Sequence, residues 1–177
     1  MKPQEIRNAI YRGAIVSALR ELNDNIRWRE MLGTKKPDKS ERDVELVLRV
    51  FSLYHTWQKY EGPMLRHLNR TQDENRAFDS DRAKAFSQRF SQAVQLLSDA
   101  VTRPFQPVFR VNTAVLDSVM VTVIENVGLT LEQIKTNYPS LIEDETFQQC
   151  IVGGTADKSK VILRHERAKE ILTNGTN

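Results

Sequence analysis

Apolar residues recur at three- and four-residue steps along most of this chain, which is the period of a helix with one buried face. The widest apolar stripe begins at Val44 and includes Val47, Leu48, Phe51 and Tyr54. A stripe of this width is typical of a helix that is covered on more than one side. We therefore expect a central helix that runs from about residue 41 to residue 58.

The residues before this stripe contain signals for a helix start. Pro37 disfavours the helical conformation in the residue that precedes it. Ser40 and Asp43 have the spacing of a capping box, in which the first side chain binds a backbone amide at the start of the helix. Upstream of these signals, residues 33–39 are expected to form a loop.

The same periodicity predicts helices over most of the remaining chain. Their expected ranges are 3–22, with Gly13 inside the helix, 25–32, 64–68, 86–101, 112–127 and 158–172, with two more that open at Thr130 and Ser140 on either side of Pro139. The polar segment 69–82 is expected to be an exposed connection. No segment alternates convincingly as a strand, apart from a residue or two near Val108. The sequence predicts an all-α fold, an irregular bundle of about eight or nine helices in a single domain over residues 1–177.

The composition indicates an ordinary globular domain and does not indicate a reaction or a ligand. The 177 residues are 40% hydrophobic and 28% charged, with a formal net charge of +3, which is ordinary for a globular domain. One cysteine, Cys150, has no second cysteine with which to form an internal disulfide, which favours a reducing compartment. The longest apolar stretch, near Val119, is too short to cross a bilayer. We expect a cytoplasmic protein with no membrane partner.

The densest group of basic residues lies in the loop before the central helix. A phosphate of nucleic acid is favoured there, because the positive end of a helix dipole and several free amides lie close by. The competing interpretation is a solvated loop, since acidic residues are interspersed with the basic ones. The residues predicted to contact nucleic acid are Lys35, Lys36, Lys39 and Arg42.

No combination of residues in the sequence predicts catalysis. The three histidines are far apart and lack the spacing of metal ligands, and His165 lies on the apolar face of the last helix. Cys150 stands beside Ile151 and is expected to be a buried hydrophobic residue. The Gly153-Gly154 loop lacks the lysine of a phosphate-binding loop. We predict no catalytic residue, no metal ligand and no cofactor.

Two segments of the chain have a distinctive sequence: residues 2–13, Lys-Pro-Gln-Glu-Ile-Arg-Asn-Ala-Ile-Tyr-Arg-Gly, and residues 42–51, Arg-Asp-Val-Glu-Leu-Val-Leu-Arg-Val-Phe. Together they resemble a large bacterial family whose members begin with a ParB/sulfiredoxin-like domain. The family includes the GmrS part of GmrSD modification-dependent restriction systems. Looser similarity extends through residues 109–117 and 153–164. The resemblance implies the helical C-terminal portion of such a protein.

This resemblance also implies what the chain lacks. The Asp-Gly-Gln-Gln-Arg-like segment of the ParB-like domain is missing, and so is the HNH nuclease motif that many members carry. The resemblance therefore implies a non-catalytic accessory domain of a phage-defence or restriction protein. It would pack against a ParB-like domain, in cis or in trans, through a seam at Arg7, Asn8 and Arg12, and assist contact with DNA. A lost interface of this kind predicts an exposed apolar patch near the first helix. The alternative is a stand-alone helical interaction domain with no nucleic-acid role.

Overall fold

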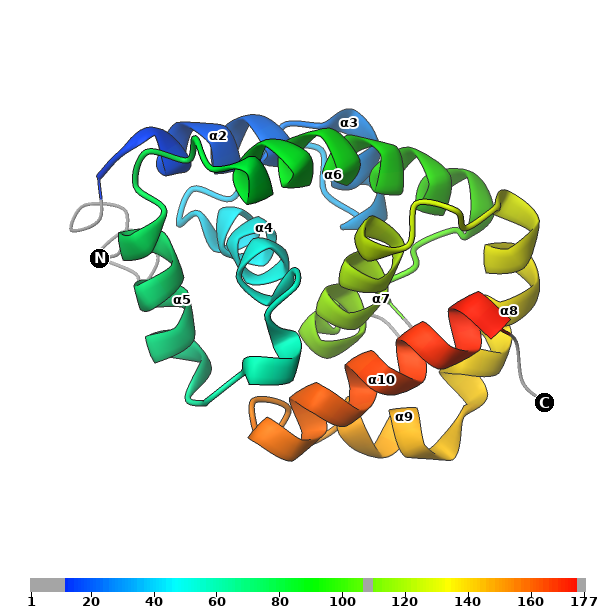
Figure 1. The fold of residues 1–177 in the computed structure, drawn as a ribbon. Helices are drawn as coiled ribbons and strands as arrows, with labels where there is room; N and C mark the ends of the chain where they lie inside the picture. The colour runs from blue at the N-terminus through cyan, green and yellow to red at the C-terminus, as the bar shows by residue number, and fades with distance from the viewer. Residues whose placement is uncertain (1–11, 107–109, 175–177) are drawn as a thin grey trace.

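Nine α-helices and one short 3-10 turn make up the part of the chain that the computed structural model describes, residues 12–106 and 110–174. The predicted all-α class is confirmed, and the helices pack as an irregular bundle (Figure 1). In chain order the elements are α2 (Ala14–Asn23), α3 (Ile26–Met31), α4 (Arg42–Leu53), η1 (Trp57–Lys59), α5 (Met64–Glu74), α6 (Asp81–Ala100), α7 (Thr113–Glu125), α8 (Leu131–Glu143), α9 (Glu145–Cys150) and α10 (Lys158–Asn174).

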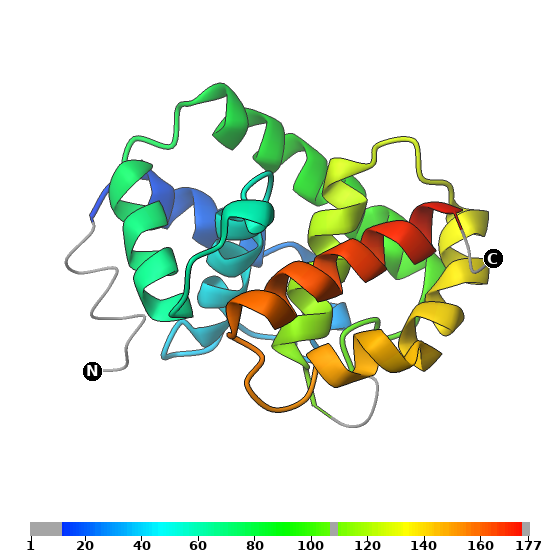
Figure 2. The same ribbon diagram turned by 60° about the horizontal axis from the view of Figure 1, so that its bottom comes forward.

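The longest helix, α6, joins the end of the molecule that α2–α5 form to the end that α8–α10 form. Its 20 residues correspond to a length of about 30 Å, and it packs against α2 and α3 as well as α7 and α8. In Figure 1 it runs across the top, with α4 and α5 beneath one end and α8 beneath the other. Figure 2, which brings the bottom forward, shows α10 lying across α7 and beside α9. The two ends therefore share α6 and α7.

The central element of the core is α7. All its residues from Ala114 to Ile124 are buried, polar ones included, because α4, α6 and α10 cover it on several sides. Asn112 starts this helix: its side-chain oxygen accepts hydrogen bonds from the backbone amides of Ala114 (2.9 Å) and Val115 (3.3 Å). A helix that is covered on all sides needs apolar residues around its whole circumference, which explains the nearly unbroken apolar sequence of this segment.

The wide apolar stripe of α4 is buried as the sequence predicts, but the helix ends at Leu53, earlier than expected. Phe51 lies against Phe78 and Phe86, with ring centroids 5.0 Å apart in both pairs. Arg82 of α6 donates to the carbonyl oxygens of Phe51 and Tyr54, which are left without helical partners where α4 ends. A side chain from a distant helix thus completes this terminus.

Gly13 lies at the start of α2 and not inside a continuous helix. It is the N-cap of α2, with extended backbone (φ 161°), and a Cβ added to it would lie 2.4 Å from the carbonyl oxygen of Arg76. The start of the predicted helix, residues 3–11, lies outside the described residues. Within α2 the apolar side chains of Ile15, Val16 and Leu19 are buried, so α2 itself does not carry the expected apolar patch.

Two other expected boundaries are wrong. The predicted connection 69–82 is helical as far as Glu74, and Thr71 is buried. The prediction failed because the residues of the packed face are polar, so no apolar stripe marks them. Pro139 lies inside α8 instead of separating two helices, and the break falls at Asp144. Asp144 accepts a hydrogen bond from the amide of Phe147 (2.7 Å) and thereby caps α9.

Candidate nucleic-acid interface

The loop between α3 and α4, residues 33–41, is held in place by the buried side chain of Arg29. Arg29 is only 5% exposed, and its guanidinium forms an ion pair with Asp43 at the start of α4. The same group donates to the hydroxyl of Thr34 (2.8 Å) and to the carbonyl oxygen of Lys36. One residue of α3 therefore fixes both the path of the loop and the first turn of α4.

Asp43 binds Arg29 and does not form the predicted capping box. Its carboxylate accepts hydrogen bonds from Arg29 and from the backbone amide of Asp38 (2.8 Å). Burial acts to raise the pKa of Asp43, but these hydrogen bonds outweigh it and hold the pKa below its ordinary value. The N-cap of α4 is Glu41, in the left-handed conformation (φ 54°) and without a side-chain capping bond. The Ser40 prediction is therefore wrong, because tertiary contacts recruit Asp43.

The acidic residues interspersed in this loop are each bound by an arginine. Asp43 pairs with Arg29, while Asp38 accepts from Arg42 Nε (2.9 Å) and Nη2 (2.6 Å). The third, Glu41, accepts from Arg20 Nε of α2 at 2.7 Å. The carboxylates that dilute the basic sequence are therefore neutralised by arginines.

The three predicted contact lysines differ from Arg42 in their surroundings. Lys35, Lys36 and Lys39 are exposed and have no ion-pair partner among the described residues. Arg42 is exposed as well, but its pairing with Asp38 raises its pKa and offsets its charge. The structure thus separates the predicted basic cluster into three unpaired lysines and one paired arginine.

A groove of about 570 Å³ opens beside this loop. It is lined by α3, by the loop, by the first turns of α4 and by the start of α7, which is distant in sequence. Leu32, Leu46 and Val111 supply its apolar surface, and Thr113 adds a hydroxyl. Sequence reasoning missed this groove and its anchor Arg29, because nothing local in the sequence indicates that residues 111–113 lie beside residues 29–46.

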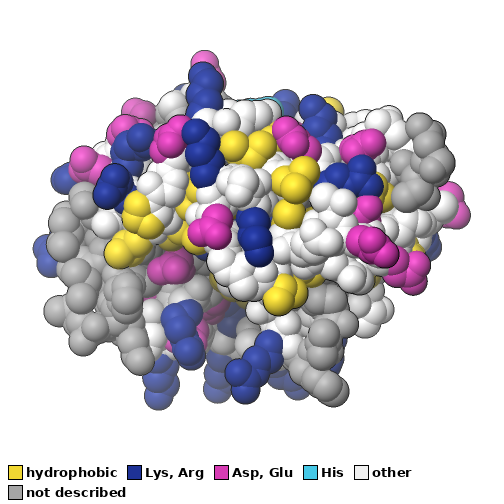
Figure 3. Space-filling view, turned by 90° about the horizontal axis from the view of Figure 1, so that it is seen from below, with side chains coloured by type: hydrophobic (Ala, Val, Ile, Leu, Met, Phe, Trp, Pro, Cys, Tyr) yellow, Lys and Arg dark blue, Asp and Glu magenta, His cyan; other side chains and the backbone are white. Residues whose placement is uncertain are grey.

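The charged side chains are not spread evenly over the surface. Figure 3 shows lysine and arginine side chains gathered along one edge of the face that is seen from below. The rest of that face mixes acidic, basic and apolar side chains. A distribution of this kind suits a local anionic contact better than a broad cationic surface.

A second group of charged residues is buried between α4, α7 and α10. Asp117 accepts hydrogen bonds from Arg164 Nε (2.9 Å) and Nη2 (2.8 Å) and from Arg49 Nε (2.8 Å). The side chains of Asp117 and Arg164 are fully buried. Two guanidiniums around one carboxylate with no access to solvent are a structural arrangement, because a substrate cannot reach them.

His165 and Cys150 are core residues, as the sequence predicts. His165 is 1% exposed, its Nδ1 lies 2.7 Å from the carbonyl oxygen of Val161, and its ring stacks on Trp57 at 5.5 Å. Burial also raises the pKa of the Cys150 thiol, which makes it a poor nucleophile at neutral pH. His165 Nε2 lies 3.9 Å from Asp117 Oδ1, but both side chains are buried and the carboxylate is already bound by Arg164 and Arg49.

The Gly153-Gly154 loop is fixed by side chains that bind its carbonyl groups. Lys160 Nζ donates to the carbonyl oxygens of Val152 (2.9 Å) and Gly153 (2.7 Å). Arg164 and Tyr60 donate to the next two residues beyond Gly154 at 2.6 and 2.8 Å. Lys160 therefore acts on the loop backbone, and the loop connects α9 to α10.

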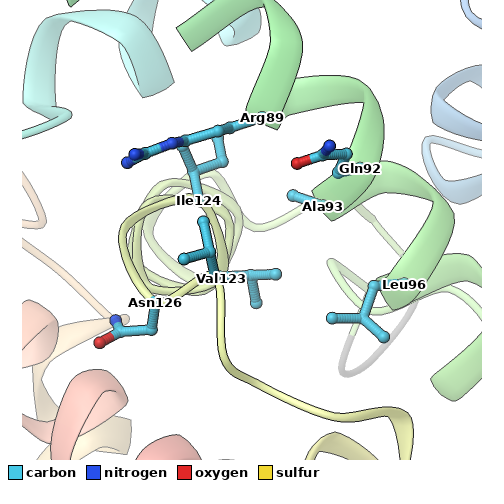
Figure 4. A pocket seen from close by; sticks show the side chains of 8 residues that line it. Arg89, Gln92, Ala93, Leu96, Val123, Ile124 and Asn126 are labelled. Carbon is cyan, nitrogen blue, oxygen red and sulfur yellow. The ribbon is translucent and has the colours of Figure 1, made fainter. Parts of the chain in front are cut away.

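The described chain shows no cluster of metal ligands, and a second hollow is small. Over residues 12–106 and 110–174, no three His, Cys, Asp or Glu side chains cluster as metal ligands. A hollow between α6 and α7, lined by Arg89, Leu96 and Val123 among others, has a volume of about 60 Å³ (Figure 4). That is room for about two water molecules. None of the described helices combines the length and apolar character that crossing a membrane requires.

The predicted interdomain seam falls mostly beyond the described residues. Arg7 and Asn8 lie outside them, and Arg12 is exposed just before the N-cap Gly13. Comparison of the chain with protein-family models, with curated proteins and with solved structures finds no match.

Proposed function

We propose that this chain is a non-catalytic helical domain that contacts nucleic-acid phosphates through Lys35, Lys36 and Lys39. One observation carries the proposal: the three lysines are exposed and unpaired among the described residues, on a loop whose carboxylates are bound by arginines. Because Arg29 anchors the loop, binding a phosphate there requires little ordering of the backbone.

The proposal extends to the setting in which this contact is made. The resemblance of residues 2–13 and 42–51 supports an accessory role in a phage-defence or restriction protein. The partner would then be a ParB-like domain in cis or in trans, with Arg12 near the seam. In that setting the loop of residues 33–41, here called the lysine loop, contributes affinity for DNA, and another domain carries out the catalysed reaction.

A salt titration of DNA binding tests the proposal. Binding of a labelled oligonucleotide is measured by fluorescence anisotropy for the unaltered chain and for the triple variant Lys35→Glu, Lys36→Glu and Lys39→Glu. Each phosphate contact contributes about −0.9 to the slope of log K against log salt on duplex DNA. The triple variant should therefore bind much more weakly, with a slope reduced by roughly two to three.

A second triple variant separates local contact from net charge. Lys84→Glu, Lys135→Glu and Lys169→Glu change exposed lysines of α6, α8 and α10 by the same total charge. Equal losses in both variants would contradict a contact at the loop. No binding of the unaltered chain even at low salt would favour the alternative, a helical protein-interaction domain without a nucleic-acid role.

A further inference from the structure

The groove beside the lysine loop differs chemically from the loop itself. Among its lining residues are three basic side chains, Arg29, Lys36 and Arg42, and three acidic ones, Asp38, Asp43 and Glu45. Two opposite pairs are in direct contact, Arg29 with Asp43 and Arg42 with Asp38. A phosphate inside the groove would meet carboxylates and gain no net attraction, so phosphates belong outside it, at the lysines.

The interior suits an uncharged, planar, polar ligand. Leu32, Leu46 and Val111 offer apolar contact, while the hydroxyls of Thr34 and Thr113 and the nearby carboxylates offer hydrogen bonds to the edge of such a ligand. The volume of about 570 Å³ exceeds what one heterocyclic base needs. Lys36 belongs both to the lining of the groove and to the three lysines of the proposed phosphate contact.

We infer that the groove accepts one unpaired nucleobase of a strand whose phosphates lie against Lys35, Lys36 and Lys39. This inference rests on the proposed function. A paired base has its face stacked and its edge occupied, so the base must come from a single strand or leave the duplex. No aromatic side chain lines the groove within the described chain. Apolar contact and hydrogen bonds, and not stacking on an aromatic ring, therefore hold the base in the groove.

An abasic strand tests this inference on the unaltered protein. Two single-stranded oligonucleotides are compared by anisotropy at low salt, one intact and one with abasic sites throughout its central segment. The intact strand should bind roughly tenfold more tightly, because only it can bury a base. A 2-aminopurine in the central segment should brighten on binding, since it leaves its stacked neighbours for a groove without aromatic side chains.

The variant Leu46→Ala tests the apolar wall of the groove. It should weaken binding of the intact strand several-fold and leave binding of the abasic strand unchanged. The matched control is Leu65→Ala on α5, where the leucine is 55% exposed, and it should alter neither. The abasic comparison needs no variant, so it decides the question even where Leu46→Ala fails to fold.

The outcomes distinguish the two proposals. Equal, salt-sensitive binding of intact and abasic strands, with no change in 2-aminopurine fluorescence, would overturn the base site and leave the lysine contact standing. Unchanged binding of the intact strand by a Leu46→Ala variant with the circular dichroism spectrum of the unaltered chain would also overturn the base site. An absence of binding to either strand would overturn the proposed function and the base site together.

Discussion

Asp117 is the acidic residue that balances the buried charges of Arg164 and Arg49. Its burial acts to raise its pKa, but Arg164 and Arg49 outweigh that effect and hold the pKa below its ordinary value. The carboxylate thus stays ionised and balances guanidiniums that are removed from water. Removing one member of such a group leaves an uncompensated buried charge.

The variant Asp117→Asn should therefore destabilise the protein by about 3–5 kcal/mol in urea unfolding, because both guanidiniums lose their anion. Asp99→Asn is the matched control, since Asp99 pairs with Arg27 on the surface at 2.5 Å. That change should cost much less stability, because both side chains of this pair are exposed and water screens their attraction. Equal losses in the two variants would contradict a structural role for the buried cluster.

His165 makes the stability depend on pH within a defined window. Burial lowers its pKa from 6.5 to about 4, against the opposing effect of Asp117. The unfolded chain therefore takes up a proton first as the pH falls from 6.5 toward 4, and the folded state loses stability over that interval. Below pH 4 both states are protonated, and this contribution changes no further.

Acidification from pH 7 to pH 5 should thus reduce the unfolding free energy by about 2 kcal/mol through His165 alone. Urea titrations at the two pH values measure this loss in the unaltered chain and in His165→Gln. The variant should lose less by about that amount, although His67, also buried with a lowered pKa, retains a contribution in the same direction. A pH dependence that is identical in both proteins would count against the prediction.

At the scale of single elements, side-chain oxygens cap the starts of α3, α6, α7, α8 and α9. Thr130 and Gln133 form the capping box that the sequence predicts for α8, with bonds of 3.2 and 2.9 Å. Asn112 does more at the start of α7, because its amide nitrogen also donates to the carbonyl oxygen of Ile151 (3.0 Å). One residue therefore caps the central helix and holds the end of α9.

The change Asn112→Ala should cost about 1–2 kcal/mol, since it removes the cap and one long-range hydrogen bond. Asn112→Asp provides the comparison, because the carboxylate keeps the capping bonds to α7 and loses only the donor to Ile151. Its stability in thermal unfolding should lie between those of the unaltered chain and the alanine variant. Equal stability of the two variants would mean that the cap contributes nothing.

At the scale of the molecule, the two ends are expected to unfold together. The helices α6 and α7 contact elements from both ends, so neither end can lose its packing alone. Leu48 of α4 and Leu172 of α10 are fully buried, and both of these helices pack against α7. Their exchange for alanine tests whether one core or two hold the fold.

Leu48→Ala and Leu172→Ala should each lower the same transition by about 2–5 kcal/mol. Circular dichroism and tryptophan fluorescence should give coincident urea curves in both variants. Trp57 stacks on His165 of α10, so its fluorescence reports on both ends of the molecule. Separated curves, or a variant that shifts only one of the two signals, would indicate two independent units.

Periodicity in the sequence was sufficient for the class of the fold and for most helices. The apolar stripes of α4, α6 and α7 and the start of α10 correspond closely to the predicted ranges, because each buried face repeats with the period of its own helix. Boundaries were wrong where a distant group replaced a local signal. Arg29 binds Asp43, which therefore does not form the expected cap, and the backbone of Arg76 leaves no room for a Cβ at Gly13, the N-cap of α2.

Periodicity and composition predict the all-α class, the core faces of the helices and a basic loop before α4. Which charges of that loop remain unpaired depends instead on contacts between distant helices. Two of the three arginines that bind the carboxylates in and beside this loop, Arg20 and Arg29, belong to α2 and α3, and one wall of the groove comes from the start of α7. The spacing of apolar residues along a helix indicates which of its faces is buried, whereas ion pairs and grooves depend on which helices meet in space.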